Sequence, residues 1–422
     1  MARRTTNNLS LIIIDQLRAD YDKFMSRCSQ LLPFHSECDT RSYPSSTEPT
    51  HLSISSGERT NKHGFISKRT RSGNTGVIEL TSKFDSEEII PIAVRAKEKG
   101  FLTYVIGGKP ETVQVMGRET DCGLRAFYDA RPDYKRFKVD GMDVNIKNIV
   151  SAKLRTLPAK VDNSSFSRVE LDDIILELLN LVMPCEGEKN RLYIASLPGL
   201  DEIGHEHGPC SDGVKAHLKT LDKKLAHLIE RYNHDITFIL TGDHGCRNIS
   251  RYVIEMGDDM TTMVVYNAMN GCLAFMEKYA LEAKETIHKI EYDGGNLRIW
   301  FKDQAVRLTP NDISFLNKYG EIQPSKDKEK KRHHLRSKHI NQGDITYIAY
   351  PDVMFCKTAW IYHEGVKERI SELKDLQKGD LPKGEHGTYY DKDRLVAFMS
   401  NYDFGLRRIT NTMIPKLIRR IM

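Results

Sequence analysis

The side chains of this chain that could do chemistry are carboxylates, imidazoles and one hydroxyl, and they are Asp15, Thr47, Asp201, His205, Asp243, His244 and His386. Carboxylate oxygens and neutral imidazoles are ligands that zinc-like ions accept in proteins. Two ions that share such groups would form a paired site, which can hold the attacking and leaving oxygens of a displacement at phosphorus. The set therefore predicts two divalent, zinc-like metal ions and a substrate that reacts at phosphorus.

The spacing of these residues favours their convergence on one site. His205 follows Asp201 by four positions in "DEIGH", so both side chains can point the same way on one helical turn. Asp243 and His244 are adjacent, and both reach one centre only where a strand ends and the backbone turns. Taken singly, "DHG" is more often a turn with a capping aspartate, and His386 is more often a loop histidine. Their joint occurrence favours the metal site.

Thr47 stands four residues before His51 in "TEPTHLSISS", a stretch that predicts a turn leading into a helix. Ser and Thr side chains at such positions commonly bond the free backbone amides of the first helical turn. From the residues alone, capping is therefore the favoured interpretation of Thr47.

The elements expected to position these residues belong to an α/β fold. Apolar, β-rich runs alternate with amphipathic stretches, and the segments in question are 9–15, 86–100, 101–108, 171–183, 191–197, 211–233 and 235–245. Uniformly apolar strands separated by helices predict a mainly parallel central sheet with helices on both faces. Polar sites gather at the carboxyl ends of such strands, and Asp15, Asp201 and Asp243 each follow an apolar run.

The 422 residues suffice for a large core and an insertion. The alternating pattern breaks into shorter segments after about residue 250, which predicts a catalytic core of residues 1–255 and 381–422 and an inserted cap of residues 256–380. Within the cap, residues 326–339 hold seven Lys or Arg residues against two acidic ones. Such a run is usually a solvated loop, and the alternatives are a rim that attracts an anionic substrate or weak contact with nucleic acid. At the end of the chain, residues 408–422 predict an amphipathic closing helix interrupted by Pro415.

Composition narrows the class of protein. No apolar run approaches the roughly 20 residues of a membrane span, and the short run "LSLIIID" behind "MARR" predicts a strand and not an export signal. The eight cysteines lack paired spacing such as C-x-x-C, so a disulfide framework is not indicated. We therefore expect a cytoplasmic protein with no membrane partner, whose oligomeric state the sequence leaves open.

Several motifs, taken in order, resemble those of the alkaline phosphatase superfamily: "IIIDQLRADY", "STEPTHLSISSGERTNKHG", "LDEIGHEHGP", "ILTGDHG" and "GEHGTYYDKDRLVAF". The branch to which the chain is most similar is the type I phosphodiesterase and nucleotide pyrophosphatase family, together with the threonine-nucleophile alkaline phosphatases. The motifs cover both ends of the predicted core, whereas the central region carries little resemblance. The resemblance implies an alkaline phosphatase-like fold.

The resemblance also implies roles for individual residues. One zinc ion would be held by Asp201, His205 and His386, and the other by Asp15, Asp243 and His244. Thr47 occupies the position of the nucleophile, which would form a phospho-threonine that water then hydrolyses. Thr50 stands where the family usually has Asn or a small residue, and it could donate one hydrogen bond to a phosphoryl oxygen. Lys109 would be either a phosphate contact or a surface lysine after a turn.

The function implied by the resemblance is metal-dependent hydrolysis of phosphodiester or pyrophosphate bonds, with a nucleotide as the expected substrate. The first alternative is a phosphomonoesterase, because the same two metals serve both reactions. The second alternative is a non-catalytic protein that binds a nucleotide or, through residues 326–339, a nucleic acid.

Overall fold

The structure is a computed structural model, and it describes residues 8–40, 42–66, 69–71, 78–80, 89–108, 112, 115–117, 122–126, 137–140, 167–183, 190–256, 262–269, 272–280, 287–301, 314–322, 345–356, 360–363, 366–369 and 381–422. Lys109 and the basic stretch 326–339 lie outside the described residues. Among the described helices, none combines the length and the apolar composition that a membrane span requires.

A nine-stranded sheet forms the centre of the molecule, in the order β23-β2-β22-β9-β1-β8-β5-β6-β7. The strands are β1 (Asn8–Ile14), β2 (Phe34–Asp39), β5 (Leu102–Gly107), β6 (Cys122–Ala126), β7 (Phe137–Asp140), β8 (Arg191–Leu197), β9 (Ile236–Gly242), β22 (Leu395–Ser400) and β23 (Arg408–Thr410). The strands β9, β1, β8, β5 and β6 run parallel, whereas β22 pairs antiparallel with both β2 and β9. The prediction of a mainly parallel central sheet is therefore confirmed.

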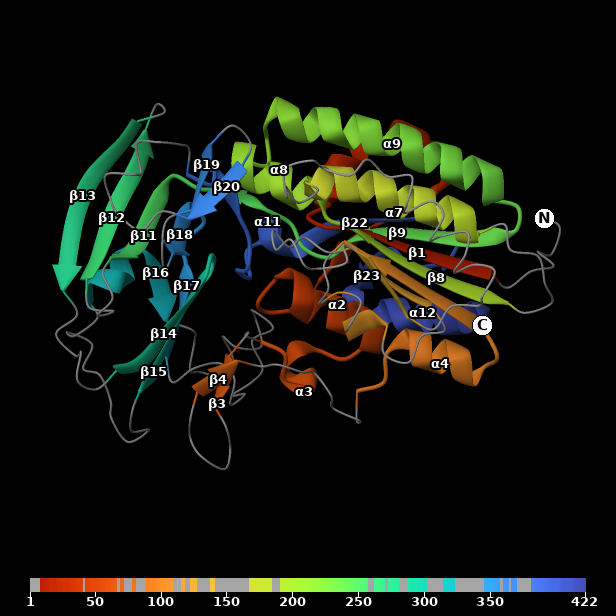
Figure 1. Cartoon of the computed structure of the whole chain (residues 1–422), viewed down its shortest axis with the longest axis horizontal. Coiled ribbons are helices and arrows are strands. Elements are labelled where there is room, and N and C mark those ends of the chain that lie inside the picture. The colour runs from red at the N-terminus through yellow and green to blue at the C-terminus, as the bar shows by residue number, and fades with distance from the viewer. Residues whose placement is uncertain are drawn as a thin grey trace.

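Helices cover both faces of this sheet (Figure 1). One face carries α1 (Ser26–Leu31), α7 (Arg168–Val182), α8 (Gly199–His207) and α9 (Asp212–Tyr232), and the other carries α2 (Thr47–Ser56), α4 (Ile92–Glu98) and α12 (Ile414–Ile421). Side chains of β1 alternate between the two layers, because successive residues of a strand point to opposite faces. Ile12 and Ile14 pack toward the first set, and Leu11 and Ile13 toward the second.

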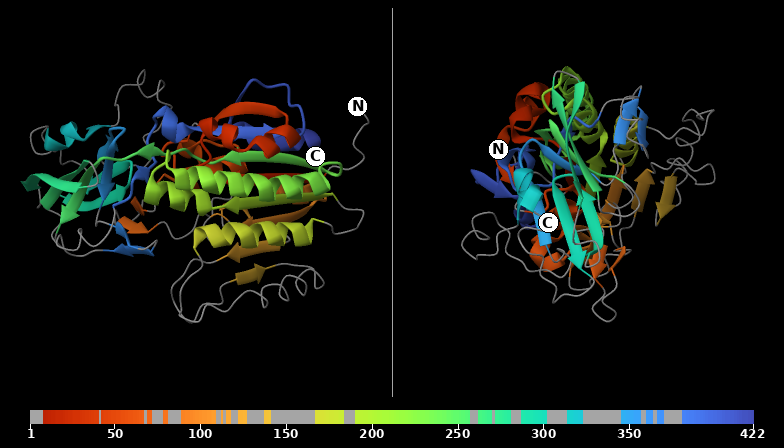
Figure 2. Two further views of the ribbon diagram at one scale, coloured as in Figure 1. Left: turned by 90° about the horizontal axis from the view of Figure 1, so that it is seen from above. Right: turned by 90° about the vertical axis from the view of Figure 1, so that its left-hand side faces the viewer.

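Smaller sheets lie beyond one end of the central sheet (Figures 1 and 2). One comprises β11 (Arg251–Met256), β12 (Thr262–Met269), β13 (Cys272–Ala280) and β18 (Val353–Cys356), and another comprises β14 (Ile287–Asp293), β15 (Asn296–Phe301), β16 (Gly320–Ile322) and β17 (Ile345–Ala349). They share a hydrophobic core of their own that includes Val253, Leu297 and Phe355. A cap bounded at residue 256 stays a prediction.

Polar contacts join the smaller sheets to the central part of the chain. The Tyr43 hydroxyl donates to Asn296 Oδ1 at 2.5 Å, and Asn296 Nδ2 donates to the carbonyl of Gly387 at 2.8 Å. The short elements around this junction and elsewhere are α3 (Thr60–His63), β3 (Arg69–Arg71), β4 (Ile78–Leu80), β10 (Arg247–Asn248), β19 (Trp360–His363), β20 (Val366–Arg369), β21 (Gly384–Glu385) and α11 (Asp391–Arg394). The smaller sheets are thus attached next to the loop that carries His386.

The end of the chain differs from the prediction. Residues Arg408–Thr410 form the edge strand β23, and α12 begins only at Ile414. Pro415 lies in the first turn of α12, where a missing backbone N–H breaks no helical hydrogen bond. The prediction that Pro415 interrupts a helix was therefore wrong, because the proline stands at the helix start.

Candidate functional site

Asp15, Asp243 and His244, the inner group, meet at the carboxyl ends of two neighbouring strands. β1 and β9 pair in parallel and end at Ile14 and Gly242, so the residues that follow are brought side by side. One ligand atom from each member lies within 4.8 Å of the others. His244 Nε2 lies 3.1 Å from Asp15 Oδ1 and 3.5 Å from Asp243 Oδ2, and all three residues are fully buried.

Hydrogen bonds fix the orientation of the inner group. Asp243 Oδ1 accepts from the backbone N–H groups of Gln16 and His244, at 3.0 and 2.8 Å. His244 donates from Nδ1 to the carbonyl of Gly245, which leaves Nε2 facing the carboxylates. His51 Nε2 lies 3.1 Å from Asp243 Oδ2. The aspartate thus keeps one oxygen bonded to the backbone and the other directed into the site.

Asp201, His205 and His386, the outer group, come from α8 and from the loop after β21. Asp201 Oδ1 lies 3.2 Å from His205 Nε2 and 3.6 Å from His386 Nε2, and one ligand atom from each residue lies within 4.8 Å of the others. The Nδ1 atoms of the two histidines face the carbonyls of Gly384 and Ser45, at 2.8 and 3.2 Å. Those contacts turn both Nε2 atoms toward Asp201, which is the arrangement that a metal-ligating histidine needs.

The inner and outer groups lie next to each other. The rings of His244 and His386 are stacked with centroids 3.8 Å apart. The structure thus brings together, from segments spread along the whole chain, all six residues that the sequence suggested as metal ligands, in the same two sets.

Thr47 is the first residue of α2, and its hydroxyl faces the inner group. Thr47 Oγ1 lies 3.2 Å from His244 Nε2. The N-cap position belongs to Ser46, whose side chain makes no capping hydrogen bond. The geometry therefore removes the main support for the capping interpretation, and it places a hydroxyl beside a candidate metal centre at the start of a helix.

The charges of the site suit bound cations. Asp15, Asp201 and Asp243 are buried within one small region. Burial lowers the pKa of His244, but Asp243 and Asp15 more than offset this effect and raise the pKa to about 10. A region that draws a proton onto a buried imidazole so strongly favours positive charge, and its carboxylate and imidazole donors are those that divalent metals accept. The residues present therefore fit two metal ions.

Further residues contact the candidate ligands, and they were not assigned a role from the sequence. Arg168 Nη1 donates to Asp201 Oδ2 at 2.5 Å, and Gln16 Nε2 donates to Asp201 Oδ1 at 3.3 Å. His51 was noted only for its spacing from Thr47. Its place one helical turn after Thr47 was a signal for a role in the site, whereas nothing in the segment around Arg168 pointed to Asp201.

The two suggested substrate contacts have different outcomes. Thr50 lies one turn after Thr47 on α2 and is fully buried, and its Oγ1 has no hydrogen-bond partner among the described residues. A hydroxyl in that state suits a donor to a phosphoryl oxygen. Lys109 lies outside the described residues, so its role stays a prediction.

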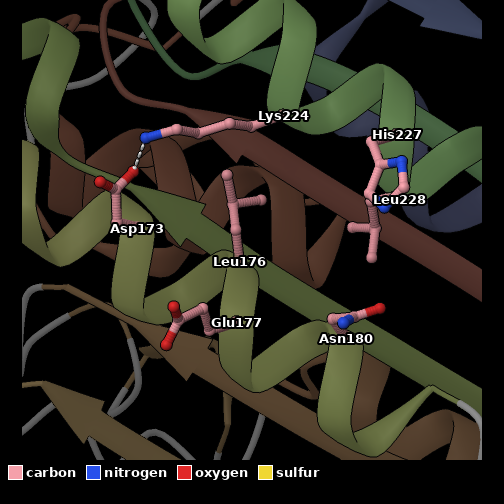
Figure 3. A pocket seen from close by; sticks show the side chains of 7 residues that line it. All are labelled: Asp173, Leu176, Glu177, Asn180, Lys224, His227 and Leu228. Atoms are coloured by element: carbon pink, nitrogen blue, oxygen red, sulfur yellow. Dashed lines mark hydrogen bonds and ion pairs between the residues drawn. The ribbon is translucent and has the colours of Figure 1, made fainter. Parts of the chain in front are cut away.

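A groove between α7 and α9 lies apart from this site. It is lined by Asp173, Leu176, Glu177, Asn180, Lys224, His227 and Leu228, and an ion pair between Lys224 and Asp173 closes one side (Figure 3). None of the candidate ligands lines it.

The sequence profile of type I phosphodiesterases / nucleotide pyrophosphatases matches residues 9–391. The chain belongs to this family. The resemblance noted from the motifs is thereby confirmed. Among curated proteins, ectonucleotide pyrophosphatase/phosphodiesterase family member 1 of Mus musculus is 26% identical to this chain over 275 residues. The match covers 61% of this chain. That match covers 26% of the mouse protein, so the chain spans about a quarter of the length of this relative.

Solved structures show the same fold as this family member. Murine ectonucleotide pyrophosphatase/phosphodiesterase 5 aligns with a TM-score of 0.63 at 14% identity, over 98% of this chain and 94% of that one. An inactive form of the same murine protein, solved in complex with AMP, aligns with a TM-score of 0.62. Phosphonoacetate hydrolase from Sinorhizobium meliloti 1021, in complex with phosphonoformate, aligns with a TM-score of 0.61 at 14% identity, over 98% and 96% of the two chains.

Proposed function

We propose that this protein is a metal-dependent hydrolase that cleaves a phosphodiester or pyrophosphate bond of a nucleotide through a phospho-threonine at Thr47. The observation that supports the proposal most directly is the convergence of the inner and outer groups beside the Thr47 hydroxyl, which lies 3.2 Å from His244 Nε2. Family membership supports the type of reaction. The murine structure that contains AMP supports a nucleotide as substrate.

Each group would hold one divalent ion, and zinc is the proposed metal because both sets mix imidazole with carboxylate ligands. When bound, the ions would supply positive charge that favours an ionised hydroxyl and stabilises the developing charge on oxygens at phosphorus. The inner group would serve Thr47, since His244 belongs to that group.

The residues of the chain would perform the rest of the reaction. Thr47 Oγ1 forms a bond to phosphorus while the bond from phosphorus to the ester oxygen breaks, and water later cleaves the phospho-threonine to regenerate the hydroxyl. The start of α2 favours an anionic phosphoryl group, because the free N–H groups of a helix N-terminus carry partial positive charge. Thr50 donates a hydrogen bond from the same helix, and Lys109 is proposed as a second phosphate contact.

The test is hydrolysis of bis-p-nitrophenyl phosphate and p-nitrophenyl phosphate, with and without a chelator. We expect turnover that the chelator abolishes, and a loss of at least about 10³-fold in Thr47→Ala. Thr220→Ala is the matched control, because Thr220 lies exposed on α9 and its hydroxyl donates to the carbonyl of Ala216 in the same helix. No chelator-sensitive turnover of either compound would favour a non-catalytic nucleotide-binding protein. Faster turnover of the monoester would favour the phosphomonoesterase.

Contacts to the part of the substrate that is not transferred would separate the diester from the monoester reaction. We propose that residues 256–380 act as a cap that provides such contacts, with the basic stretch 326–339 as an anion-attracting rim. A panel of nucleoside triphosphates, dinucleotides and cyclic nucleotides would identify the substrate through its product profile. The cytoplasmic location suggested by the N-terminal sequence stays a prediction.

A further inference from the structure

Gln16 has an unusual backbone conformation at the centre of the site. Among the residues that the structure describes, it is the one non-glycine residue with a positive φ, at 71°. Left-handed backbone is unfavourable for a side chain with a Cβ, and such strain persists only where the surroundings hold it in place. Gln16 is also fully buried.

The contacts of Gln16 connect the two groups of candidate ligands. Its backbone N–H donates to Asp243 Oδ1 of the inner group at 3.0 Å. Its side-chain Nε2 donates to Asp201 Oδ1 of the outer group at 3.3 Å. That oxygen of Asp201 is the one that faces His205 and His386. One strained residue thus contacts a carboxylate of each group.

Helix α8 makes room for this side chain. A Cβ added at Gly204 would lie 1.7 Å from Gln16 Oε1, so only a glycine there lets the amide lie against the helix. Gly204 lies between Asp201 and His205 in α8, so the amide packs against the helix that carries two of the outer ligands.

We propose that Gln16 is a positioning residue that sets the outer group relative to the inner group. Its main chain holds Asp243, and its amide orients the oxygen of Asp201 that would bind the outer metal. A carboxylate oxygen has two lone pairs, so it can accept from the amide and still bind a cation. The inference rests on the proposed function, because it assumes that both groups bind metal.

The test uses Gln16→Gly. Glycine adopts a φ of 71° without strain and keeps the N–H that bonds Asp243, so the variant removes the side chain and leaves the backbone contact in place. Zinc titrated into metal-free protein, followed by calorimetry, should show two sites in the wild type. In the variant, one site should weaken by about 10-fold or more, as happens when a hydrogen-bond partner of a metal ligand is lost. The melting temperature of the metal-free variant should be unchanged or higher.

A second background shows which site changes. His386→Ala lacks an outer ligand, so it should bind one zinc ion, and adding Gln16→Gly to it should leave that remaining affinity unchanged. Gln16→Asn, whose amide is one methylene shorter, should reproduce the loss seen in Gln16→Gly, because it no longer reaches Asp201.

The outcomes separate this inference from the proposed function. Two zinc sites in the wild type with unchanged affinities in Gln16→Gly would overturn the role of Gln16 alone. A lower melting temperature with unchanged zinc affinities would show that Gln16 only stabilises the fold, and it would overturn the role as well. A wild type that binds no zinc would overturn both proposals.

Discussion

The inner and outer groups consist of similar ligands but are built from different parts of the fold. The inner group follows directly from β1 and β9, two neighbouring parallel strands in the centre of the sheet, and its side chains are fully buried. The outer group is carried by α8 and by a loop, and the side chains of His205 and His386 are each 13% exposed. The inner group is thus part of the core, whereas the outer group stands on a helix and a loop, and two of its three side chains are partly exposed.

The inner and outer groups also differ in what lies next to them. Thr47 lies beside His244 of the inner group, so the proposed nucleophile belongs to the fully buried half of the site. The outer group lies near the junction with the smaller sheets, since Asn296 bonds the residue that follows His386. We infer that the inner group activates the nucleophile and that the outer group meets the part of the substrate that leaves.

The largest expected effect separates His244 from His205, a matched pair of histidines in the two groups. His244→Ala should lower kcat/KM by about 10³-fold, because it removes the group beside the hydroxyl that we propose as the nucleophile. His205→Ala should cost at least about 100-fold, because loss of a hydrogen-bond partner of a metal ligand already costs roughly 10–100-fold and His205 is itself a proposed ligand. Steady-state kinetics on bis-p-nitrophenyl phosphate measure both. A larger loss in His205→Ala would reverse the assignment of roles.

Removal of metal should also distinguish the groups. During dialysis against a chelator, bound metal should fall from two ions per chain to one and only later to none, because the outer group, whose histidines are partly exposed, releases its ion first. Metal analysis and activity assays on the same samples follow the two steps, and added zinc should restore activity. His386→Ala should show the slow step only. A single step in the wild type would contradict the contrast between the groups.

The same contrast explains how much the sequence could predict. The strand ends at Asp15 and Asp243 were predictable, because uniformly apolar runs mark buried parallel strands and their carboxyl ends lie together. The pairing of Asp201 with His205 was predictable from helical spacing. These are local patterns, and they also yielded the α/β class and the central sheet.

The polar contacts around the ligands could not be predicted, because they join segments that are distant in sequence. Gln16 and Asp201 are 185 positions apart, and Arg168 and Asp201 are 33 apart. No periodicity connects such pairs, since a hydrogen bond between side chains depends on tertiary packing. The left-handed conformation of Gln16 was equally hidden, because the residue type gives no hint of it.

A buried ion pair supports the loop of the outer group. Asp393 Oδ2 accepts from Arg247 Nη1 and from the backbone N–H of Thr388, both at 2.9 Å, and Thr388 lies two residues after His386. Asp393→Asn should lower the free energy of unfolding by about 3 kcal/mol, because it leaves the buried Arg247 without its charge partner. Urea unfolding measures the loss.

The control for this prediction lies on the same short helix. Asp391→Asn removes an ion pair with Arg394, and the carboxylate of Asp391 is 73% exposed. This change should alter the stability by less than about 0.5 kcal/mol. Similar effects of the two substitutions would show that burial of the pair does not determine its contribution.

An effect smaller than that of Asp393 is expected at Arg251 and Asp352, which tie the start of β11 to the turn before β18. The hydrogen bond from Arg251 keeps the pKa of Asp352 below its usual value. A lowered pKa stabilises the folded protein at pH values above the ordinary aspartate pKa of about 3.9, and that contribution is lost as the pH falls through the lowered pKa.

The Asp352 side chain is 43% exposed, so Asp352→Asn should cost at most about 1 kcal/mol at pH 7. Urea midpoints should converge for variant and wild type as the pH falls below about 4. A difference that persisted or grew in acid would mean that Asp352 stabilises the fold through packing and not through its charge. The difference in effect between Asp352 and the buried Asp393 could then not be attributed to their exposure.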